Sequence, residues 1–568
     1  MNKKMKMKKK EEKPWFKFWP KEVPKNIKYP KIPLSDFLKR SAEKHPDKTA
    51  TVYFDRKIIY KELDLMVDKF ATALTDLGIK KGDRVAIFLP NTPQFIISYY
   101  GAIKSGAIVT AISPLHKERE VELELSDSGA ETIVVLDLLY PILEKVMKKT
   151  KVKNVIVVDL KEYMPKVKAF LGSILGKIPS YKVERKSNVY YFKELMNRYE
   201  AKPPKVEINP EEDLAALLYT GGTTGVPKGV MLTHMNLVSN TIMCAEWLRG
   251  EEAKETALAV LPLFHSYGMT TGMNAPIYMA EKIILLPKFD PISTFQAIQK
   301  YKVTIFCGVP TLYAILLSHP DLGKYNYTSV RFCISGSAAL PPEVQKKFME
   351  ITGGVLVEGY GLTECSPVTH CNPPDITLKT VKVGSIGLPW PDTDAKIMDM
   401  ERGEKELKTG EVGELVVKGP QIMKGYWNMP KETADVLRNG WCYTGDVGKM
   451  DEDGYFYITD RKKDLIKYKG YSVYPRELED VLFEHPAVKL CGIVGKSNTT
   501  VGEFPKAYVV LKERSVATEK EIMDFVNEKV APYKAIREVE FRTELPMTLI
   551  GKVLKRALKE EEVNFTIN

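Results

Sequence analysis

Between residues 32 and 160 the chain alternates helical patterns with short runs of β-branched residues. Apolar residues recur at helical spacing in 34–47 and 60–79. Four runs bounded by turn residues follow, "RVAIFLP", "AIVTAI", "TIVVLD" and "NVIVVDL", and they are typical of buried parallel strands. Such alternation predicts a layered α/β architecture, which resumes from "DLAALLYT" through "VRFCISGSAAL".

The chain length predicts more than one domain. With 568 residues it exceeds the roughly 250–300 residues at which a single core stops growing. We expect a large N-terminal domain of layered α/β subdomains, with a small β-subdomain after about 380, where strands become short and glycine-punctuated. A boundary is expected near 460. Beyond it, helices near 475–484 and 518–530 and strands near 488–494 and 506–511 predict a small α+β C-terminal domain.

The positive charge is concentrated at the N-terminus. Residues 1–31 hold twelve Lys and three Glu, a net of 12 − 3 = +9, so only +2 of the total +11 remains elsewhere. Nucleic-acid binders usually spread basic charge over a folded face, so no nucleic-acid partner is expected. Trp15, Phe16, Phe18 and Trp19 lie among the lysines. This arm therefore either docks its aromatics on the domain or contacts an anionic membrane surface.

Two further segments depart from the α/β pattern. Residues 161–208 are basic, partly amphipathic and Pro-rich at their end, which indicates a surface insertion or a membrane-facing helix, although two glycines disfavour a helix. Residues 256–280 form the longest uncharged stretch. Because prolines, glycines and threonines interrupt it, we expect buried strand and loop there, not a membrane helix.

Neither the N-terminal sequence nor the cysteine pattern predicts a secreted protein. No apolar core follows the first lysines, so no secretory signal is predicted. The seven cysteines contain no C-x-x-C pair, which favours a reduced cytoplasmic protein and indicates no zinc site. Peripheral attachment to the inner membrane face stays open because of the basic arm.

The stretch "TGGTTGVPKG" (220–229) has the composition of a phosphate-binding loop. Glycines let backbone N–H groups converge, threonines add hydroxyl donors and a lysine adds a charge. A Walker-type loop is excluded by the spacing, because the second glycine would fall on Val226 or Pro227 and Lys228 is followed by Gly229. A plain turn would explain the glycines but not the threonines and the lysine.

This loop belongs to a set of motifs that resembles the adenylate-forming superfamily, which includes acyl-CoA synthetases. "YTGGTTGVPKGVMLTH", "VEGYGLTECSP", "WCYTGDVGKMDEDGYFYITDRKKDLIKYKGYSVYPRELE" and "LPMTLIGKVLKRAL" follow one another in the family's order. The resemblance covers residues 33 to 560. It implies a two-step reaction with Mg²⁺ as cofactor. A carboxylate attacks the α-phosphate of ATP to form an acyl-adenylate, and the thiol of CoA then displaces AMP.

The resemblance implies residue roles for the first step, in which an anion approaches an anionic phosphate and cations are needed. Lys552 would meet the carboxylate and α-phosphate, and Thr363 would donate to that phosphate. Glu364 and Thr220 would hold Mg²⁺. His265 would lie beside the carboxylate and the thiol path, in a catalytic, gating or purely structural role. The loop that grips the β- and γ-phosphates would consist of Thr220, Gly221, Gly222, Thr223, Thr224, Gly225 and Lys228.

The nucleoside site is implied in the same way. Tyr360 would stack on adenine, and Asp446 would accept hydrogen bonds from the ribose hydroxyls, with Arg461 nearby. Taken alone, Tyr360 would be read as a core aromatic and Asp446 as a turn residue. The whole adenine and ribose set is Gly336, Ser337, Ala338, Glu358, Gly359, Tyr360, Asp446, Ile458 and Arg461.

The second step implies a movement of the C-terminal domain. Relatives rotate a lid, here residues 465–568, about a hinge at 460–464 in which Lys463 holds the central position. CoA would then meet Lys467, Lys469, Gly470 and Tyr471. A glutamine that plant-type relatives place slightly downstream is Ser472 in this chain, which departs from their pattern.

The segments "PWFKFWPKEVPKNIKYPKIPL" and 161–200 resemble bacterial medium- and long-chain fatty-acyl-CoA ligases, so a fatty acid is the expected substrate. The acyl pocket would contain His265, Ser266, Met269, Thr270 and Pro310, although Met269 lies where one long-chain relative has an aromatic gate. An aryl or short-chain acid is the alternative. A carrier-protein loader, a luciferase-type oxygenase and a non-enzymatic acyl-nucleotide binder are less favoured, and a homodimer stays open.

Overall fold

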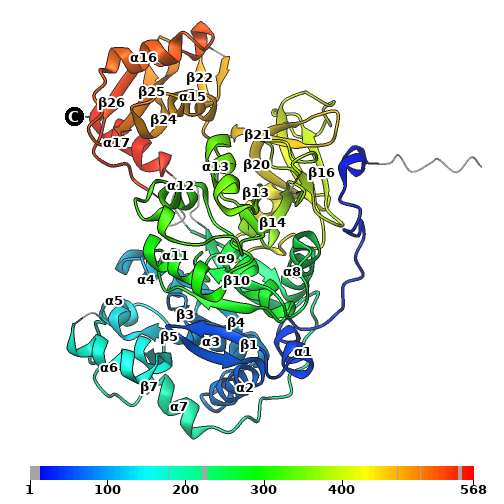
Figure 1. Ribbon diagram of the computed structural model, residues 1–568, viewed down its shortest axis with the longest axis vertical. Coiled ribbons are helices and arrows are strands. Elements are labelled where there is room, and N and C mark those ends of the chain that lie inside the picture. The colour runs from blue at the N-terminus through cyan, green and yellow to red at the C-terminus, as the bar shows by residue number, and fades with distance from the viewer. Residues whose placement is uncertain are drawn as a thin grey trace, which may run out of the picture.

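The computed structural model describes residues 13–176, 178–220, 227–375, 377–469, 471–498, 500–547 and 553–567, with side chains up to residue 562. Figure 1 shows the C-terminal residues, coloured orange to red, as a separate lobe at the upper end of the molecule. The N-terminal strands and helices, blue to cyan, form the lower end. The two ends are joined by the green and yellow central part of the chain.

The largest sheet has eight strands and is mostly parallel, as the alternating pattern predicts. Antiparallel pairing occurs only where β9 meets β8 and β18. The strands run in the order β18 (Gly425–Tyr426), β9 (Lys228–Thr233), β8 (Leu214–Thr220), β4 (Ile108–Ala111), β3 (Arg84–Phe88), β5 (Thr132–Leu136), β6 (Asn154–Val158) and β7 (Val189–Tyr191).

Both faces of this sheet are covered by helices. Val85 and Ile87 of β3 pack into one apolar cluster with α2 (Tyr60–Asp76) and α3 (Pro93–Lys104). Ala86 and Phe88, which point to the other face, pack into a second cluster with α4 (Glu118–Ser128) and α5 (Tyr140–Met147). A strand buried on both faces needs a continuous apolar run, which explains the four consecutive apolar residues of "RVAIF".

A second, smaller sheet has four strands. Its strands are β10 (Thr256–Ala259), β11 (Lys282–Leu285), β1 (Thr49–Tyr53) and β2 (Arg56–Ile59). Isolated bridges at Ile305 link β10 to the sheet of β12 (Phe332–Ser335), β13 (Val355–Gly361), β14 (Val368–Cys371) and β15 (Leu388–Pro389). Further helices of the N-terminal part of the chain are α1 (Asp36–Lys44), α8 (His234–Leu248), α11 (Pro291–Tyr301), α12 (Pro310–Ser318) and α13 (Pro342–Thr352).

The expectation of strand and loop throughout 256–280 is wrong in its second half. After β10 the chain forms three joined helical pieces, α9 (Ser266–Met269), a π-helical turn (Thr270–Asn274) and α10 (Ala275–Tyr278). Pro276 lies in the first turn of α10, where its missing N–H is tolerated. The π-helical turn before α10 interrupts the regular helical spacing, which is why the sequence showed no helical pattern there.

The small β-subdomain is present. It is an antiparallel sheet of β16 (Asp394–Met398), β17 (Gly413–Lys418), β20 (Trp441–Met450), β19 (Leu437–Arg438) and β21 (Phe456–Arg461), with α14 (Pro430–Val436) beside it. The N-terminal arm runs along this sheet, and its helix η1 (Pro14–Phe18) lies near β16 in Figure 1.

The aromatic residues of the arm dock on the fold. Trp15 is 6% exposed and contacts Phe456 at 6.0 Å between ring centroids. Trp19 is 9% exposed and meets Trp247 of α8 edge-on at 5.4 Å. Lys17 pairs with Asp453 at 2.7 Å. Of the two interpretations of the arm, the docked one therefore describes residues 13–31, and residues 1–12 lie outside the described part.

The insertion at 161–208 contains more regular structure than expected. Strand β7 extends the main sheet at its edge, followed by α7 (Phe192–Arg198), and α6 (Lys166–Ile174) forms a helix in spite of its glycine. A three-residue edge strand is too short to show a periodic pattern, which is why the sequence did not reveal it. No helix in the described ranges is long and apolar enough to cross a membrane.

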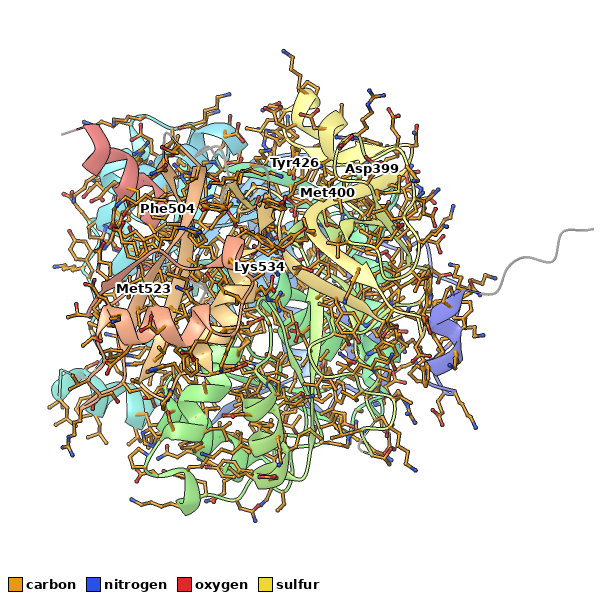
Figure 2. The ribbon with its side chains drawn as sticks, turned by 90° about the horizontal axis from the view of Figure 1, so that it is seen from above. Asp399, Met400, Tyr426, Phe504, Met523 and Lys534 are labelled. Atoms are coloured by element: carbon orange, nitrogen blue, oxygen red, sulfur yellow. The ribbon has the colours of Figure 1, made fainter. Side chains whose placement is uncertain are left out.

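The C-terminal lobe has its own sheet and core. Its strands are β23 (Tyr471–Val473), β22 (Ile466–Tyr468), β25 (Gly502–Leu511), β24 (Val488–Asn498) and β26 (Glu538–Phe541). Its helices are α15 (Pro475–Phe483), α16 (Glu519–Asn527) and α17 (Lys555–Ile567). Two apolar clusters form inside the lobe, and Lys534, labelled in Figure 2, pairs with Glu477 at 2.7 Å. The helices and strands predicted beyond 475 lie at these positions.

Candidate active site

The predicted phosphate loop connects two antiparallel strands. Thr220 ends β8, Lys228 begins β9, and the two residues are paired across the hairpin. A Walker loop leads from a strand into a helix, so this connection agrees with the exclusion based on spacing. Gly221, Gly222, Thr223, Thr224 and Gly225 lie outside the described residues.

Glu364 and Lys228 meet at one tyrosine. The hydroxyl of Tyr426 donates to Glu364 Oε1 at 2.7 Å, and Lys228 Nζ lies 5.0 Å from the centroid of the Tyr426 ring. Burial and the neighbouring Glu364 carboxylate hold the pKa of Tyr426 far above its usual value, so the hydroxyl stays a donor. Tyr426 comes from β18, which pairs with β9, and it is labelled in Figure 2. Because β18 pairs with β9, Tyr426 connects Glu364 with Lys228 at the C-terminal end of the phosphate loop.

Thr363 is held against the helical segment that begins at His265. The hydroxyls of Thr363 and Ser266 lie 3.1 Å apart in a buried contact. Thr270, one turn further on, donates to the carbonyl of Ser366 at 3.0 Å. The "GLTECSP" turn and the "HSYGMT" helix are therefore joined by two hydrogen bonds.

His265 caps that helix. Its Nδ1 accepts from the backbone N–H of Tyr267 at 3.2 Å, and its side chain is half-buried. The cap fixes the ring and requires an unprotonated Nδ1. Met269 and Pro310 of the predicted acyl pocket are buried, Met269 within the main apolar cluster.

The predicted adenine wall and Tyr360 lie at the ends of neighbouring parallel strands. Ser335 of β12 is in register with Glu358 of β13, so Gly336–Ala338, which follow β12, begin beside Gly359 and Tyr360 of β13. An added Cβ at Gly336 would lie 3.0 Å from the Tyr267 ring, which is tighter than an ordinary van der Waals contact. Carboxyl ends of parallel strands are where α/β sheets commonly bind ligands.

Asp446 is the buried centre of a polar cluster. Its carboxylate is 4% exposed, accepts a hydrogen bond from the Tyr360 hydroxyl, and pairs with Nε of Arg461, which is 46% exposed, at 2.9 Å. Asp446 and Arg461 face each other across the β20–β21 pair. The Asp446 charge raises the pKa of the Arg461 guanidinium, and burial with Asp446 raises the pKa of the Tyr360 phenol. Ile458 lies on β21 and packs half-buried against the core.

Glu358 lies beneath this cluster and supports the adenine wall. Its Oε2 accepts from the backbone N–H of Leu340 at 3.0 Å. Burial raises the pKa of Glu358 to about 7, and the charge of Arg476 from the C-terminal lobe works against that rise.

The predicted hinge is a turn between two lobes. Asp464 N–H donates to the carbonyl of Arg461 at 3.0 Å, and Asp460 accepts from the N–H of Arg476 at 2.8 Å. Lys463 lies within this turn, and desolvation lowers the pKa of its ammonium group. The N–H of Arg476 thus joins the C-terminal lobe to β21 next to the hinge.

The predicted CoA residues lie on the β22–β23 hairpin of the C-terminal lobe. Lys467 Nζ donates to the hydroxyl of Ser472 at 2.8 Å. The serine that replaces the relatives' glutamine therefore lies directly beside the lysine. Tyr471 is 60% exposed and stacks on Tyr533 at 4.9 Å. Lys469 has a φ of 47°, in the left-handed region required by the tight turn, and Gly470 lies outside the described residues.

The segment that carries Lys552 is closed at its base. Met547 and Val553 form a bridge, and the N–H of Leu554 donates to the carbonyl of Pro546 at 2.7 Å. Lys552 itself lies in 548–552, outside the described residues. No cluster of three His, Cys, Asp or Glu side chains that could bind a metal occurs among the residues that are described.

Sequence comparison connects these features to known proteins. The AMP-binding enzyme family matches residues 38–427, and the AMP-binding enzyme C-terminal domain matches residues 477–552. The chain belongs to the AMP-binding enzyme family. This AMP-binding enzyme is 46% identical over 554 residues to the "Long-chain-fatty-acid--CoA ligase" of Bacillus subtilis, covering 97% of this chain and 98% of that one.

Solved structures show the same architecture. The AMP-binding enzyme matches an anthranilate CoA ligase, AuaEII, solved with anthranoyl-AMP, at a TM-score of 0.82, 27% identity and coverage of 94% and 97%. It matches ATP-bound MatB from Rhodopseudomonas palustris at 0.81 and apo MatB at 0.71, each with 28% identity and coverage of 93% and 99%. The expected fold class, a large N-terminal part with a small C-terminal domain, is thereby confirmed.

Tyr426 is the site residue that sequence reasoning missed in this AMP-binding enzyme. It lies 62 residues from Glu364 and about 200 from the phosphate loop, in a two-residue strand. Its only signal was the aromatic pair in "KGYW" after a glycine-rich run. Such a pair is ordinarily read as core packing.

Proposed function

We propose that the chain is an AMP-forming fatty-acid–CoA ligase that acts on medium-to-long-chain fatty acids. The observation that carries the proposal is the 46% identity to a bacterial long-chain ligase over nearly the whole of both chains. The buried Asp446 cluster supports the nucleotide half of the reaction, since carboxylate and guanidinium groups suit ribose hydroxyls.

In the first step, a fatty-acid carboxylate oxygen attacks the α-phosphorus of ATP, and the bond to the departing pyrophosphate breaks. Lys552 would neutralise charge on the carboxylate and α-phosphate, and Thr363 would donate to that phosphate. The 220–228 loop would hold the β- and γ-phosphates. Tyr360 would stack on adenine against Gly336–Ala338.

Mg²⁺ would be held by Glu364 and Thr220. The donor set fits, because Mg²⁺ commonly uses one or two protein oxygens and completes its shell with water and substrate phosphates. The Tyr426 hydroxyl, 2.7 Å from Glu364, would orient the carboxylate. The ion would neutralise phosphate charge in the transition state.

In the second step, the CoA sulfur attacks the acyl carbon after losing its proton, and the acyl–phosphate bond breaks to release AMP. Rotation of residues 465–568 about Lys463 would withdraw Lys552 and bring Lys467, Lys469, Gly470 and Tyr471 to the adenylate. The two TM-scores for ATP-bound and apo MatB are consistent with a family whose members adopt more than one arrangement.

The substrate assignment is tested by AMP release across straight-chain acids from acetate to stearate, with CoA, ATP and Mg²⁺ present. A maximum at medium or long chains supports the proposal. A maximum with benzoate or acetate would instead favour the aryl or short-chain alternative. Omitting CoA from parallel reactions separates adenylate formation from thioester formation.

A further inference from the structure

Helix α6 presents its large apolar side chains to the outside. Val167, Phe170, Leu171, Ile174 and Leu175, at the end of the helix, are 69%, 66%, 50%, 66% and 62% exposed. Not one residue of α6 is buried, although it is a helix of nine residues. A surface helix of a water-soluble domain normally turns its apolar face to the core.

The face of α6 opposite to these residues packs against the protein and so fixes the orientation of the helix. At 100° per residue, the five large side chains occupy one arc of the helix and Ala169 and Gly172 lie on the other. Ala169 packs on the main core, and a Cβ at Gly172 would lie 2.3 Å from Ile178 Cδ1. The small face is thus seated against the protein, which forces the large face outward.

Basic residues border the exposed arc. Lys166 and Lys168 flank it on its two sides, and Lys168 pairs with Asp55, which ties the helix to the β1–β2 turn. Residues 161–190 carry seven basic and two acidic side chains, a net of 7 − 2 = +5. Four of these basic groups, Lys161, Lys168, Arg185 and Lys186, are paired with acids, which leaves Lys166 and Lys182 among the described basic residues of this segment.

We infer that α6 is an interfacial anchor that inserts Phe170 and Ile174 among the acyl chains of an anionic phospholipid surface. A large apolar arc bordered by lysines is the pattern of helices that lie in a bilayer interface. Figure 1 places α6 at the edge of the molecule opposite the C-terminal lobe, so lipid contact there leaves that lobe clear of the surface. The inference is independent of the proposed reaction.

The first test is flotation of the full chain with vesicles of phosphatidylcholine and phosphatidylglycerol, without fatty acid, ATP or CoA. The wild type should float, less so in high salt. Phe170→Ser with Ile174→Ser should lower the bound fraction about tenfold. Leu65→Ser with Val516→Ser, at positions 50% and 91% exposed elsewhere, should bind as the wild type. Equal flotation of both double variants, or none of the wild type, would overturn the inference.

The second test does not depend on the double variant folding normally. The seven native cysteines are buried, so Ile174→Cys offers a single accessible thiol for an environment-sensitive dye, with Val516→Cys as control. Anionic vesicles should shift the emission of the dye at 174 to shorter wavelength and leave that at 516 unchanged. If sedimentation instead shows a dimer that Phe170→Ser/Ile174→Ser abolishes, with no dye response to vesicles, a second copy covers this face and the lipid inference is wrong.

Discussion

The nucleotide residues and the CoA residues lie in regions that are built differently. Tyr360 and Arg461 lie near the ends of β13 and β21, and Asp446, which faces Arg461 from within β20, is 4% exposed. Lys467 and Tyr471 lie on a short hairpin at the edge of the small sheet, and Tyr471 is 60% exposed. The first group is already joined by an ion pair and a hydrogen bond, whereas we expect the second to become a site only next to another surface.

The same contrast exists in the contacts that hold each region. Asp446 is fixed by two charged or hydrogen-bonded partners from different strands, and Thr363 by buried hydroxyl contacts. Near the hinge, the contacts between the lobe that carries Lys552 and the rest of the chain include the hydrogen bond from the N–H of Arg476 to Asp460. We infer that one region is preorganised for ATP and the other is delivered by rotation.

The largest effect is expected from Lys552→Ala. Removing the cation that meets the carboxylate and α-phosphate should lower adenylate formation about 10³-fold. Thioester formation from supplied acyl-AMP should stay within a few fold, because that step uses the rotated arrangement. The two half-reactions are measured by pyrophosphate release and by acyl-CoA from synthetic acyl-AMP. Equal loss of both half-reactions would contradict the proposal that Lys552 serves adenylate formation only.

The next largest effect is expected from Lys463→Pro. Proline fixes φ at the hinge, so thioester formation should fall about hundredfold or more while adenylate formation persists. Lys463→Ala is the matched control and should keep both half-reactions, since it removes the ammonium group but not the backbone freedom. If alanine is as damaging as proline, Lys463 acts through its charge and not as a hinge.

Asp446→Asn is expected to affect ATP binding with a smaller effect. The amide cannot balance the Arg461 charge, so the KM for ATP should rise about tenfold to hundredfold, as for loss of charged hydrogen bonds. Binding of acyl-AMP should weaken in parallel, which ligand titration would measure. An unchanged KM for ATP would show that Asp446 does not bind the ribose.

The smallest effect is expected from Tyr426→Phe, which removes only the hydroxyl that donates to Glu364. Adenylate formation should fall about threefold to tenfold, and the Mg²⁺ concentration for half-maximal rate should rise. Tyr443→Phe removes a comparable hydroxyl, which donates to the Gly403 carbonyl at 2.6 Å, and should leave the Mg²⁺ dependence unchanged. A slower rate with an unaltered Mg²⁺ profile would assign Tyr426 a purely packing role.

Some features of the chain could be predicted because they depend on residues close in sequence. The buried strand runs, the helices and strands beyond 475, and the non-Walker spacing of the phosphate loop all follow from local pattern. The 266–278 helix could not be predicted, because its π-helical turn is stabilised by contacts such as Thr270 to Ser366, 96 residues away. Strand β7 was likewise hidden by its three-residue length.

The sequence alone determined the family's motifs, their order and the chemical types of the site residues, since these are properties of short segments. Tertiary structure decided which of those segments meet. It docked Trp15 on Phe456, brought Tyr426 to Glu364 and turned the apolar side of α6 outward. Each outcome depends on contacts between residues far apart in the chain or on how a whole helix is seated. Periodicity and spacing report only on neighbours, so they cannot supply this information.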